Sequence, residues 1–262
     1  MTIIRPSTKL AYGSGLIGPR RRGGNGAEYP ANITTKYESS DGVNPTAASI
    51  KAEWKYGADQ GYAGWYVPSP APSDFTGTHA WHFGTSGGGT WPGGLVAYST
   101  ALGATDNTGP GCNNIQVLAQ VNSVQAYWGY YVIQLDAVGG GAIALYSESD
   151  ITQWRVVAHN GTAWTQGTLR NFVNGGDFRN GNWHYVRLWY NDGVISVKFW
   201  RNTLANEPAG YDLYNYDLRT DFTGAQLPPS FDMWSVSTGG AWNGAVYVGI
   251  HDWNIYFGQG TP

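Results

Sequence analysis

Two adjoining segments alternate large side chains around an Asp-Gly pair, and one face of this alternation carries residues suited to ligand chemistry. The run is WHYVRLWYNDGVISVKFWR, residues 183–201, and that face carries Tyr185, Arg187, Trp189, Lys198 and Trp200. Cationic side chains form charge-assisted hydrogen bonds with carboxylates, and indole faces stack on pyranose rings or anchor protein interfaces. The set therefore suits an acidic sugar. The alternative is that the rings are covered by the N-terminal segment, by long loops or by a neighbouring subunit.

The Asp192-Gly193 pair predicts a two-residue hairpin loop, because both central residues of such a loop need positive φ. That loop fixes the register of the two strands. The core face then pairs Tyr190 with Ile195, Leu188 with Val197 and Val186 with Phe199. The outer face pairs Trp189 with Ser196, Arg187 with Lys198 and Tyr185 with Trp200. Like charges directly opposite each other are destabilising. We therefore expect this face to be wet, or to hold a carboxylate or an anionic ligand between Arg187 and Lys198.

A second segment, QWRVVAH at 153–159, contributes one more cation by the same alternation. Trp154, Val156 and Ala158 share one face, and Arg155 lies on the other. The candidate ligand-binding residues, for a glycan or a protein, are Arg155, Tyr185, Arg187, Trp189, Lys198 and Trp200.

Other short motifs that could bind a ligand are weaker. His79 and His82 in HAWH lie three apart, so on a strand they project to opposite faces and do not share a metal ion. The segments GTSGGGTWPGG and AVGGGA lack the lysine and the strand-to-helix context of a phosphate-binding loop. Cys112 is the only cysteine, which excludes an intrachain disulfide and favours a small turn or core residue. We expect no metal ligands among these residues.

Charge and composition limit the partners of the chain. The chain has 262 residues and a net charge of −3, which disfavours nucleic acid as the main partner. Residues 1–55 are net positive and the remainder is net negative, so the basic leading segment, with Arg20, Arg21 and Arg22, is a candidate assembly arm. Only 13% of residues are charged and 15% are aromatic, and Lys198 is the single lysine after residue 55. Lysine is depleted where proteins cover one another, so this composition favours an assembled state.

The spacing of apolar residues predicts an all-β chain. Strands are expected near 33–38, 49–57, 63–67, 78–83, 94–98, 114–122, 127–137, 142–148, 153–159, 182–190, 194–201, 232–236 and 245–257. Residues 1–35 are expected to form an extended arm, and residues 36–262 one β domain. No secretion signal opens the sequence, and no span of about 18 apolar residues occurs, so we expect no membrane insertion.

The run NWHYVRLWYNDGVISVKFWRNTLANEP resembles the end of laminin G-like, concanavalin A-like jelly-roll domains. In that family an aromatic-His-Tyr-Val-Arg strand precedes a turn glycine, a strand ending in Lys-x-Trp and a Glu-Pro step, here Glu207-Pro208. The later GAVYVGIHDWNIYFG is similar to the closing strands of the same fold. The resemblance covers about residues 180–257. It implies a two-sheet antiparallel jelly-roll sandwich with a concave face that binds glycans in many members.

Domains of this kind with a Gly/Trp/Tyr-rich composition resemble those of tailed-bacteriophage virion proteins. The resemblance implies a non-enzymatic structural protein of minor tail or capsid decoration type, located in the virion. Its partners would be other virion proteins, copies of itself and a host-surface polysaccharide. A free-standing carbohydrate-binding module is the alternative, and a polysaccharide lyase or hydrolase is a further one.

The enzyme alternatives lack parts of their motifs. Glycoside hydrolases of this fold use paired carboxylates with a third acid on the same strand, and Glu148-Ser149-Asp150 lacks that third acid. Alginate lyases of this fold use Arg, Gln, His and Tyr on the concave face, but the predicted register turns His184 away from Tyr185 and Arg187. We therefore expect no catalytic residues and no cofactor. A structural calcium ion, at DNTG (106–109) or Asp221, stays open because laminin G-like domains often bind one.

Overall fold

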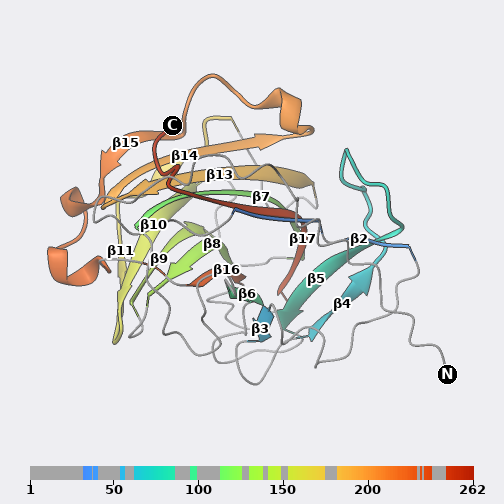
Figure 1. Cartoon of the computed structure of the whole chain (residues 1–262), viewed down its shortest axis with the longest axis horizontal. Helices are drawn as coiled ribbons and strands as arrows, with labels where there is room; N and C mark the ends of the chain where they lie inside the picture. Colours follow the sequence, from blue (N-terminus) through green and yellow to red (C-terminus); the bar gives the residue numbers. More distant parts are fainter. Residues whose placement is uncertain are drawn as a thin grey trace.

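The computed structural model describes residues 32–36, 38–40, 54–56, 62–85, 95–98, 113–125, 130–137, 141–148, 153–174, 182–228, 231, 233–237 and 246–262. These residues form two antiparallel sheets with short 3-10 turns, and the part of the chain described contains no α-helix. Figure 1 shows the β13, β14 and β7 strands stacked above β8, β9, β10 and β16. The all-β, two-sheet sandwich predicted from the sequence is confirmed.

The first sheet has nine strands in the order β15-β14-β13-β7-β17-β5-β2, with β1 paired to β17 and β4 paired to β5. Its strands are β1 (Ile33–Lys36), β2 (Glu38–Ser39), β4 (Tyr62–Tyr66), β5 (His79–Thr85), β7 (Asn114–Gln125), β13 (Trp183–Asn191), β14 (Val194–Arg201), β15 (Leu213–Asp217) and β17 (Val246–Phe257). Residues 33–35 of the predicted arm thus lie in β1 of this sheet, whereas Arg20, Arg21 and Arg22 lie outside the described residues.

The second sheet has eight strands in the order β11-β10-β9-β8-β16-β6-β3, with β12 paired to β10. Its strands are β3 (Trp54–Tyr56), β6 (Leu95–Tyr98), β8 (Tyr130–Asp136), β9 (Gly141–Ser147), β10 (Gln153–Asn160), β11 (Trp164–Gln166), β12 (Arg170–Asn171) and β16 (Met233–Ser237). The short strands β11, β12 and β15 were not predicted. Each of these strands pairs with a longer strand. Because each has few residues, its own apolar pattern is too short to predict a strand.

The predicted hairpin register is confirmed pair by pair from His184 opposite Arg201 to Asn191 opposite Val194. Asp192 and Gly193 have φ of 45° and 86°, the left-handed conformation that the two-residue loop requires. This register turns the alternate residues of β13 and β14 into the space between the sheets.

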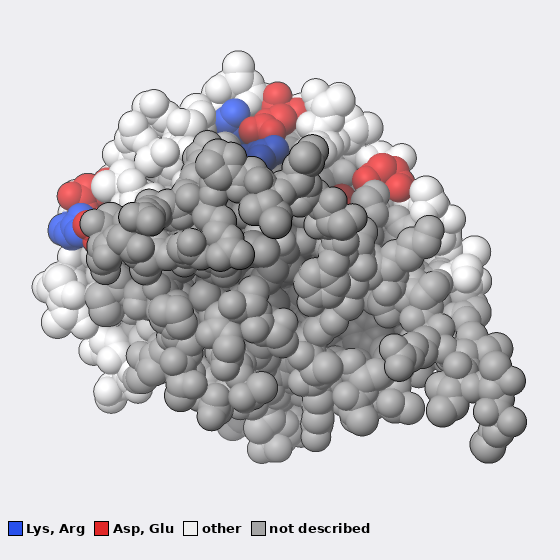
Figure 2. Space-filling model, in the orientation of Figure 1, with Lys and Arg blue, Asp and Glu red and all other residues white. Residues whose placement is uncertain are grey.

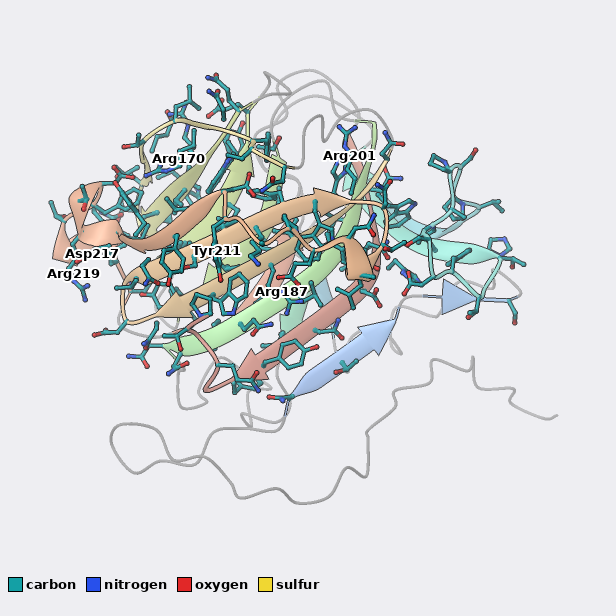
Figure 3. The ribbon with its side chains drawn as sticks, turned by 90° about the horizontal axis from the view of Figure 1, so that it is seen from above. Arg170, Arg187, Arg201, Tyr211, Asp217 and Arg219 are labelled. Carbon is teal, nitrogen blue, oxygen red and sulfur yellow. The ribbon has the colours of Figure 1, made fainter. Side chains whose placement is uncertain are left out.

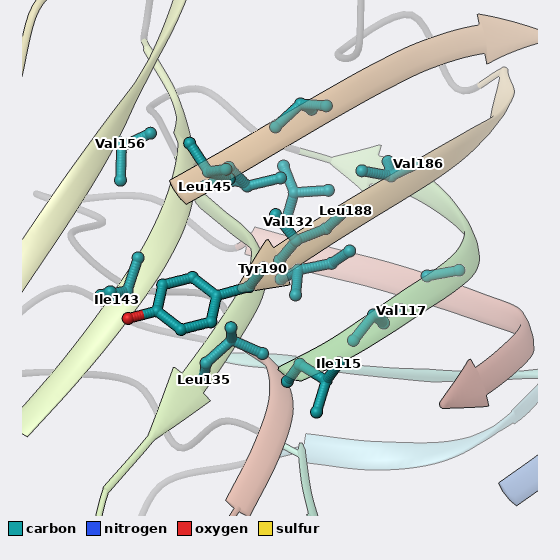
Figure 4. Packing of buried hydrophobic residues seen from close by; sticks show 14 of the residues in the cluster. Ile115, Val117, Val132, Leu135, Ile143, Leu145, Val156, Val186, Leu188 and Tyr190 are labelled. Carbon is teal, nitrogen blue, oxygen red and sulfur yellow. The ribbon is translucent and has the colours of Figure 1, made fainter. Parts of the chain in front are cut away.

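The main hydrophobic core lies between the two sheets. It combines residues of β7, β13 and β14 with residues of β8, β9 and β10 (Figure 4). Trp154 of β10 is 1% exposed and packs edge-on against Phe199 of β14, with ring centroids 5.0 Å apart. Burial raises the pKa of the Tyr190 hydroxyl to about 12, and the ring packs edge-on against Phe231. The core thus fixes which face of each strand points outward.

Two loops cross the outer face of the nine-stranded sheet. The 67–78 loop precedes β5, and its Pro70 carbonyl accepts a hydrogen bond from Trp183 Nε1 at 2.9 Å. The 202–212 loop joins β14 to β15, contains the 3-10 helix η2 (Leu204–Asn206), and passes over the sheet in Figure 1. Ser73 Oγ donates to the Asn202 carbonyl at 2.8 Å, which links the two loops. Among the residues described, no helix has the length and apolar character to cross a membrane.

Candidate functional site

The outer face of the nine-stranded sheet is polar yet largely buried. Neighbouring strands β14, β13, β7 and β17 bring their outward residues into adjacent rows. Its buried polar residues include Gln116, Gln120, Asn122, Ser196, Lys198, His251, Asp252 and Asn254. Buried polar groups require partners, so this face is where ligands or internal polar contacts must be found.

Arg187 and Lys198 are neutralised by a carboxylate from the chain itself. Arg187 Nη2 lies 2.6 Å from Glu207 Oε2, and Lys198 Nζ lies 3.2 Å from Glu207 Oε1. Lys198 Nζ also donates to the Pro208 carbonyl at 2.8 Å. The side chains of Arg187, Lys198 and Glu207 are 17%, 9% and 24% exposed. The sequence predicted that this face is wet or holds a carboxylate or an anionic ligand between these cations, and the 202–212 loop supplies a carboxylate.

The tryptophan rings beside these cations are covered by the same loop. Trp200 stacks on Tyr185 at 5.3 Å, is 2% exposed, and donates from Nε1 to the Thr203 carbonyl. Trp189 is 6% exposed and packs against Tyr211, with ring centroids 5.7 Å apart. The structure thus brings together five of the six candidate residues, but they lie beneath a loop of their own chain.

Arg155 lies apart from the other five candidates, on the outward face of β10 in the other sheet. It forms an ion pair with Glu148 and donates to Gln166 Oε1 at 2.8 Å. Glu148, which was considered as a catalytic acid, therefore serves this ion pair, while Ser149 and Asp150 lie outside the described residues. In Figure 2 cationic and anionic atoms lie side by side at the upper edge and at the left.

An aromatic pair continues the covered rings toward solvent. Tyr211 and Tyr214 have ring centroids 4.6 Å apart, and Tyr214 is 58% exposed. Lys198 Nζ lies 4.4 Å from the Tyr211 ring centroid, within cation–π range. Figure 3 shows Tyr211 beside β13 and β14, near Arg187. The sequence analysis missed both tyrosines, and Asn215, with φ of 45°, breaks the alternation that would place Tyr214 and Tyr216 on one face.

A second polar cluster lies at the other end of this face, under the 67–78 loop. His251 Nδ1 lies 2.6 Å from Gln120 Oε1, 3.7 Å from Asp74 Oδ1 and 3.7 Å from Asp252 Oδ2. Tyr185 donates from its hydroxyl to Asp74 Oδ1 at 3.4 Å. Burial, together with the charges of Asp252 and Asp74, raises the pKa of Tyr185 far above its ordinary value. The phenol thus stays protonated and serves as a donor.

The sequence analysis considered His79, His82 and His184, and the structure describes the side chains of His79 and His184. Neither of these two lies near Arg187. His184 is fully buried, lies opposite Arg201 in the register, and accepts from Arg201 Nε at 3.0 Å. It therefore faces away from Tyr185, as predicted. His79 Nδ1 lies 2.7 Å from Thr78 Oγ1, while the His82 side chain, Cys112 and the DNTG segment lie outside the described residues.

The carboxylate of Asp221, which the sequence analysis considered as a calcium ligand, accepts hydrogen bonds from other residues of the chain. It accepts from the Thr168 amide at 3.0 Å, the Thr168 hydroxyl at 2.6 Å and the Tyr216 hydroxyl at 3.0 Å, with Arg170 at 3.6 Å. Burial alone would raise the pKa of Asp221, but these bonds and the arginine charge outweigh it and lower the pKa. The carboxylate thus joins β11, β12 and the segment after β15.

Asp221→Asn is expected to lower the free energy of unfolding by about 2 kcal/mol at pH 7, because the charged acceptor of three hydrogen bonds and one ion pair is lost. A lowered folded-state pKa contributes stability above the ordinary aspartate pKa, and this contribution is lost as the pH falls through the folded-state value. Urea unfolding at pH 7 and pH 3 should show the difference between wild type and variant shrinking at the lower pH. A difference that grew on acidification would contradict this assignment.

Comparison with known proteins places the fold. No protein-family model and no curated protein matches the sequence. A family 7 alginate lyase A1-II′ variant in complex with its substrate is 11% identical with a TM-score of 0.50, over 87% of this chain and 93% of that chain. A protein of unknown function with a galectin-like fold from Bacillus subtilis is 8% identical, with a TM-score of 0.44, over 81% and 92%. A galectin from Caenorhabditis elegans is 11% identical, with a TM-score of 0.37, over 55% and 84%.

Because these sequence identities are low, the likeness shows the fold alone. The fold assignment rests on the lyase match, which has a TM-score of 0.50. The chain has a galectin-like, concanavalin A-like jelly-roll β-sandwich fold. A fold shared at 11% identity does not decide the activity of this chain.

Proposed function

We propose that this chain is a non-enzymatic structural protein of a bacteriophage virion, of minor tail or capsid decoration type, whose β-sandwich contacts host-surface glycans. The observation that supports the glycan contact is the pair formed by the partly buried Tyr211 and the exposed Tyr214 at the edge of the nine-stranded sheet. The cations and tryptophans beneath it are already satisfied by the chain, so the tyrosines are the part of this face left to meet a partner.

The chemistry of the two tyrosines suits a sugar. Each ring presents an apolar face for stacking on a pyranose and a hydroxyl for hydrogen bonding. Trp189 supports Tyr211 from below, and the Lys198 ammonium lies against the Tyr211 ring, which limits the motion of that platform. A supported aromatic platform loses little conformational entropy when it binds.

The virion setting is supported by the resemblance and by composition. Charged residues make up 13% of the chain, and Lys198 is the single lysine after residue 55, which favours a body covered by other proteins. The proposed partners are other virion proteins and copies of this chain, fastened by the basic arm. The full chain should form assemblies whose mass in solution exceeds that of one copy, and removal of residues 1–30 should leave folded monomers. Retained assembly without these residues would contradict the arm's role.

Tyr214→Ala is expected to weaken binding to a bacterial-surface polysaccharide roughly two- to tenfold, since stacking on one ring contributes on the order of 0.5–1.5 kcal/mol. A panel of purified polysaccharides screened with the full chain identifies the sugar, and calorimetry then compares the variants. Leu169→Ala is the matched control, because Leu169 is also an exposed large side chain, at 40%. No saturable binding by the unmodified chain across the panel would remove the glycan role while leaving the assembly role to its own test.

A polysaccharide lyase is the second candidate, and one arrangement favours it. Gln120, Tyr185 and His251 lie together, with Arg187 on the same face, and these are the residue types that alginate lyases of this fold use. The carboxylates of Asp74 and Asp252 disfavour it, because they would repel a uronate. Release of unsaturated uronate from alginate by the chain, abolished in Tyr185→Phe, would establish the lyase and overturn the non-enzymatic proposal.

A further inference from the structure

Three metal-ligating side chains converge under the 67–78 loop, and we infer that they bind a divalent transition-metal ion, with Zn²⁺ as the preferred ion. The ligand atoms of Asp74, His251 and Asp252 all lie within 4.8 Å of one another. His251 Nδ1 is 3.7 Å from Asp74 Oδ1 and 3.7 Å from Asp252 Oδ2. Donor atoms about 2.0–2.2 Å from a tetrahedral zinc ion lie roughly 3.3–3.6 Å from one another, so small side-chain shifts would complete this geometry.

A β-bulge in β17 creates the arrangement. The pairing of β17 with β7 places Ile250 opposite Val121 and Trp253 opposite Ala119. His251 and Asp252 therefore share the single position opposite Gln120 on the partner strand. Bulges re-aim side chains in this way, and they recur next to functional sites. Two successive residues of one strand thus point a nitrogen and a carboxylate toward the same location, where Asp74 of the 67–78 loop meets them.

An orphaned buried donor lies beside this location. Gln120 is fully buried, and its Oε1 lies 2.6 Å from His251 Nδ1. Binding of the ion would release this hydrogen bond and the Nδ1 proton to solvent, which would free the Gln120 amide to turn. The Nε2 of the same amide is buried and has no hydrogen-bond partner among the described residues. A zinc ion with three protein ligands keeps water or hydroxide as its fourth ligand. Gln120 Nε2 would donate a hydrogen bond to that oxygen, which would satisfy the amide.

The donor set selects the class of ion. One imidazole nitrogen with two carboxylates suits Zn²⁺ and its first-row neighbours, whereas Ca²⁺ prefers six to eight oxygen ligands. His251 is fully buried and Asp252 is 7% exposed, so these two ligands are shielded from solvent and are out of reach of a sugar ring.

The surrounding side chains hold the ligands in place. The His251 ring packs edge-on against Phe75 at 5.5 Å and against Trp183 at 6.2 Å. Tyr185 donates to the Asp74 carboxylate. Groups of this kind orient metal ligands and raise affinity. The bound ion would join the 67–78 loop to β17 across the rim of the sheet, a role that is independent of glycan binding at Tyr214.

Calorimetric titration of the full chain, stripped of metal by a chelator, with ZnCl₂ tests the inference. One Zn²⁺ per chain is expected to bind, and Co²⁺ is expected to give the intense visible absorption of four-coordinate cobalt. Asp74→Asn should weaken Zn²⁺ binding at least tenfold. The Asp74 side chain is 42% exposed, so this variant does not endanger folding.

Asp192→Asn is the matched control, because Asp192 is an exposed carboxylate, at 75%, on the hairpin loop between β13 and β14. Its Zn²⁺ affinity should equal that of the unmodified chain. Equal binding by Asp74→Asn would place the ion elsewhere and overturn the inference, as would no binding of Zn²⁺. Binding of CaCl₂ in preference to ZnCl₂, with the same Asp74 dependence, would overturn the assignment to a transition metal.

Discussion

Replacing Trp154 with alanine is expected to lower the free energy of unfolding by about 4 kcal/mol, the largest effect of any single substitution considered. Trp154 is 1% exposed and contributes its ring to the core between the sheets. It packs against Phe199 at 5.0 Å and Phe172 at 6.4 Å, so its loss leaves a cavity lined by aromatic groups of both sheets. Urea unfolding followed by circular dichroism measures the loss.

Trp154→Phe separates packing from the indole nitrogen. Nε1 of Trp154 is buried without a hydrogen-bond partner among the described residues, so phenylalanine removes no bond and should cost only about 1–2 kcal/mol. Trp164 of β11 is the matched control, because it is partly exposed on the outer face, and Trp164→Ala should cost about 1 kcal/mol. A loss below 1 kcal/mol for Trp154→Ala would mean that the two sheets do not pack as described.

Glu207→Ala is expected to lower the free energy of unfolding by about 3 kcal/mol, since it leaves two largely buried cations without their shared carboxylate. Arg187 and Lys198 are paired across the strands and repel each other, and Glu207 contacts both. Glu207→Gln keeps the shape and one acceptor, so it should recover part of the loss. Chemical unfolding of both variants at low and high salt measures the effect.

A double-mutant cycle identifies the source of that loss. Combining Glu207→Ala with Lys198→Met should cost less than the sum of the single changes, because one unpaired cation is removed. Asp192→Asn is again the control. The Asp192–Arg219 ion pair is 3.8 Å long, and both side chains are at least half exposed. Exposed ion pairs contribute roughly 0–1 kcal/mol, so this change should have little effect on stability. Strict additivity in the cycle would show that Glu207 acts on its loop and not on the cations.

Local geometry explains what the sequence could predict. The Asp-Gly loop determines the register of its two strands, so the facing of every residue from Tyr185 to Trp200 could be predicted. The same register predicted that the face with Arg187 and Lys198 is wet or holds an anion. That Glu207 supplies the carboxylate could not be predicted, because the alternation of residues along the strands does not determine the path of the 202–212 loop.

Non-local order explains what the sequence could not predict. The alternation places Arg155 correctly on the outer face of β10, but it does not say which sheet β10 joins. The cluster of Asp74, Gln120 and His251 gathers residues more than 40 positions apart, and the bulge at 251–252 breaks the alternation that would have oriented them. Sheet order and bulges arise from tertiary packing, which a single strand's pattern does not contain.

The most direct test of the account compares two aromatic variants in one calorimetric titration with the bound polysaccharide. Tyr214→Ala removes an exposed ring, and Trp200→Phe changes a ring that is 2% exposed beneath the 202–212 loop. Tyr214→Ala should weaken binding roughly two- to tenfold, whereas Trp200→Phe should leave the affinity unchanged. The opposite order of effects would contradict the account, because the covered rings would then have to open to the sugar.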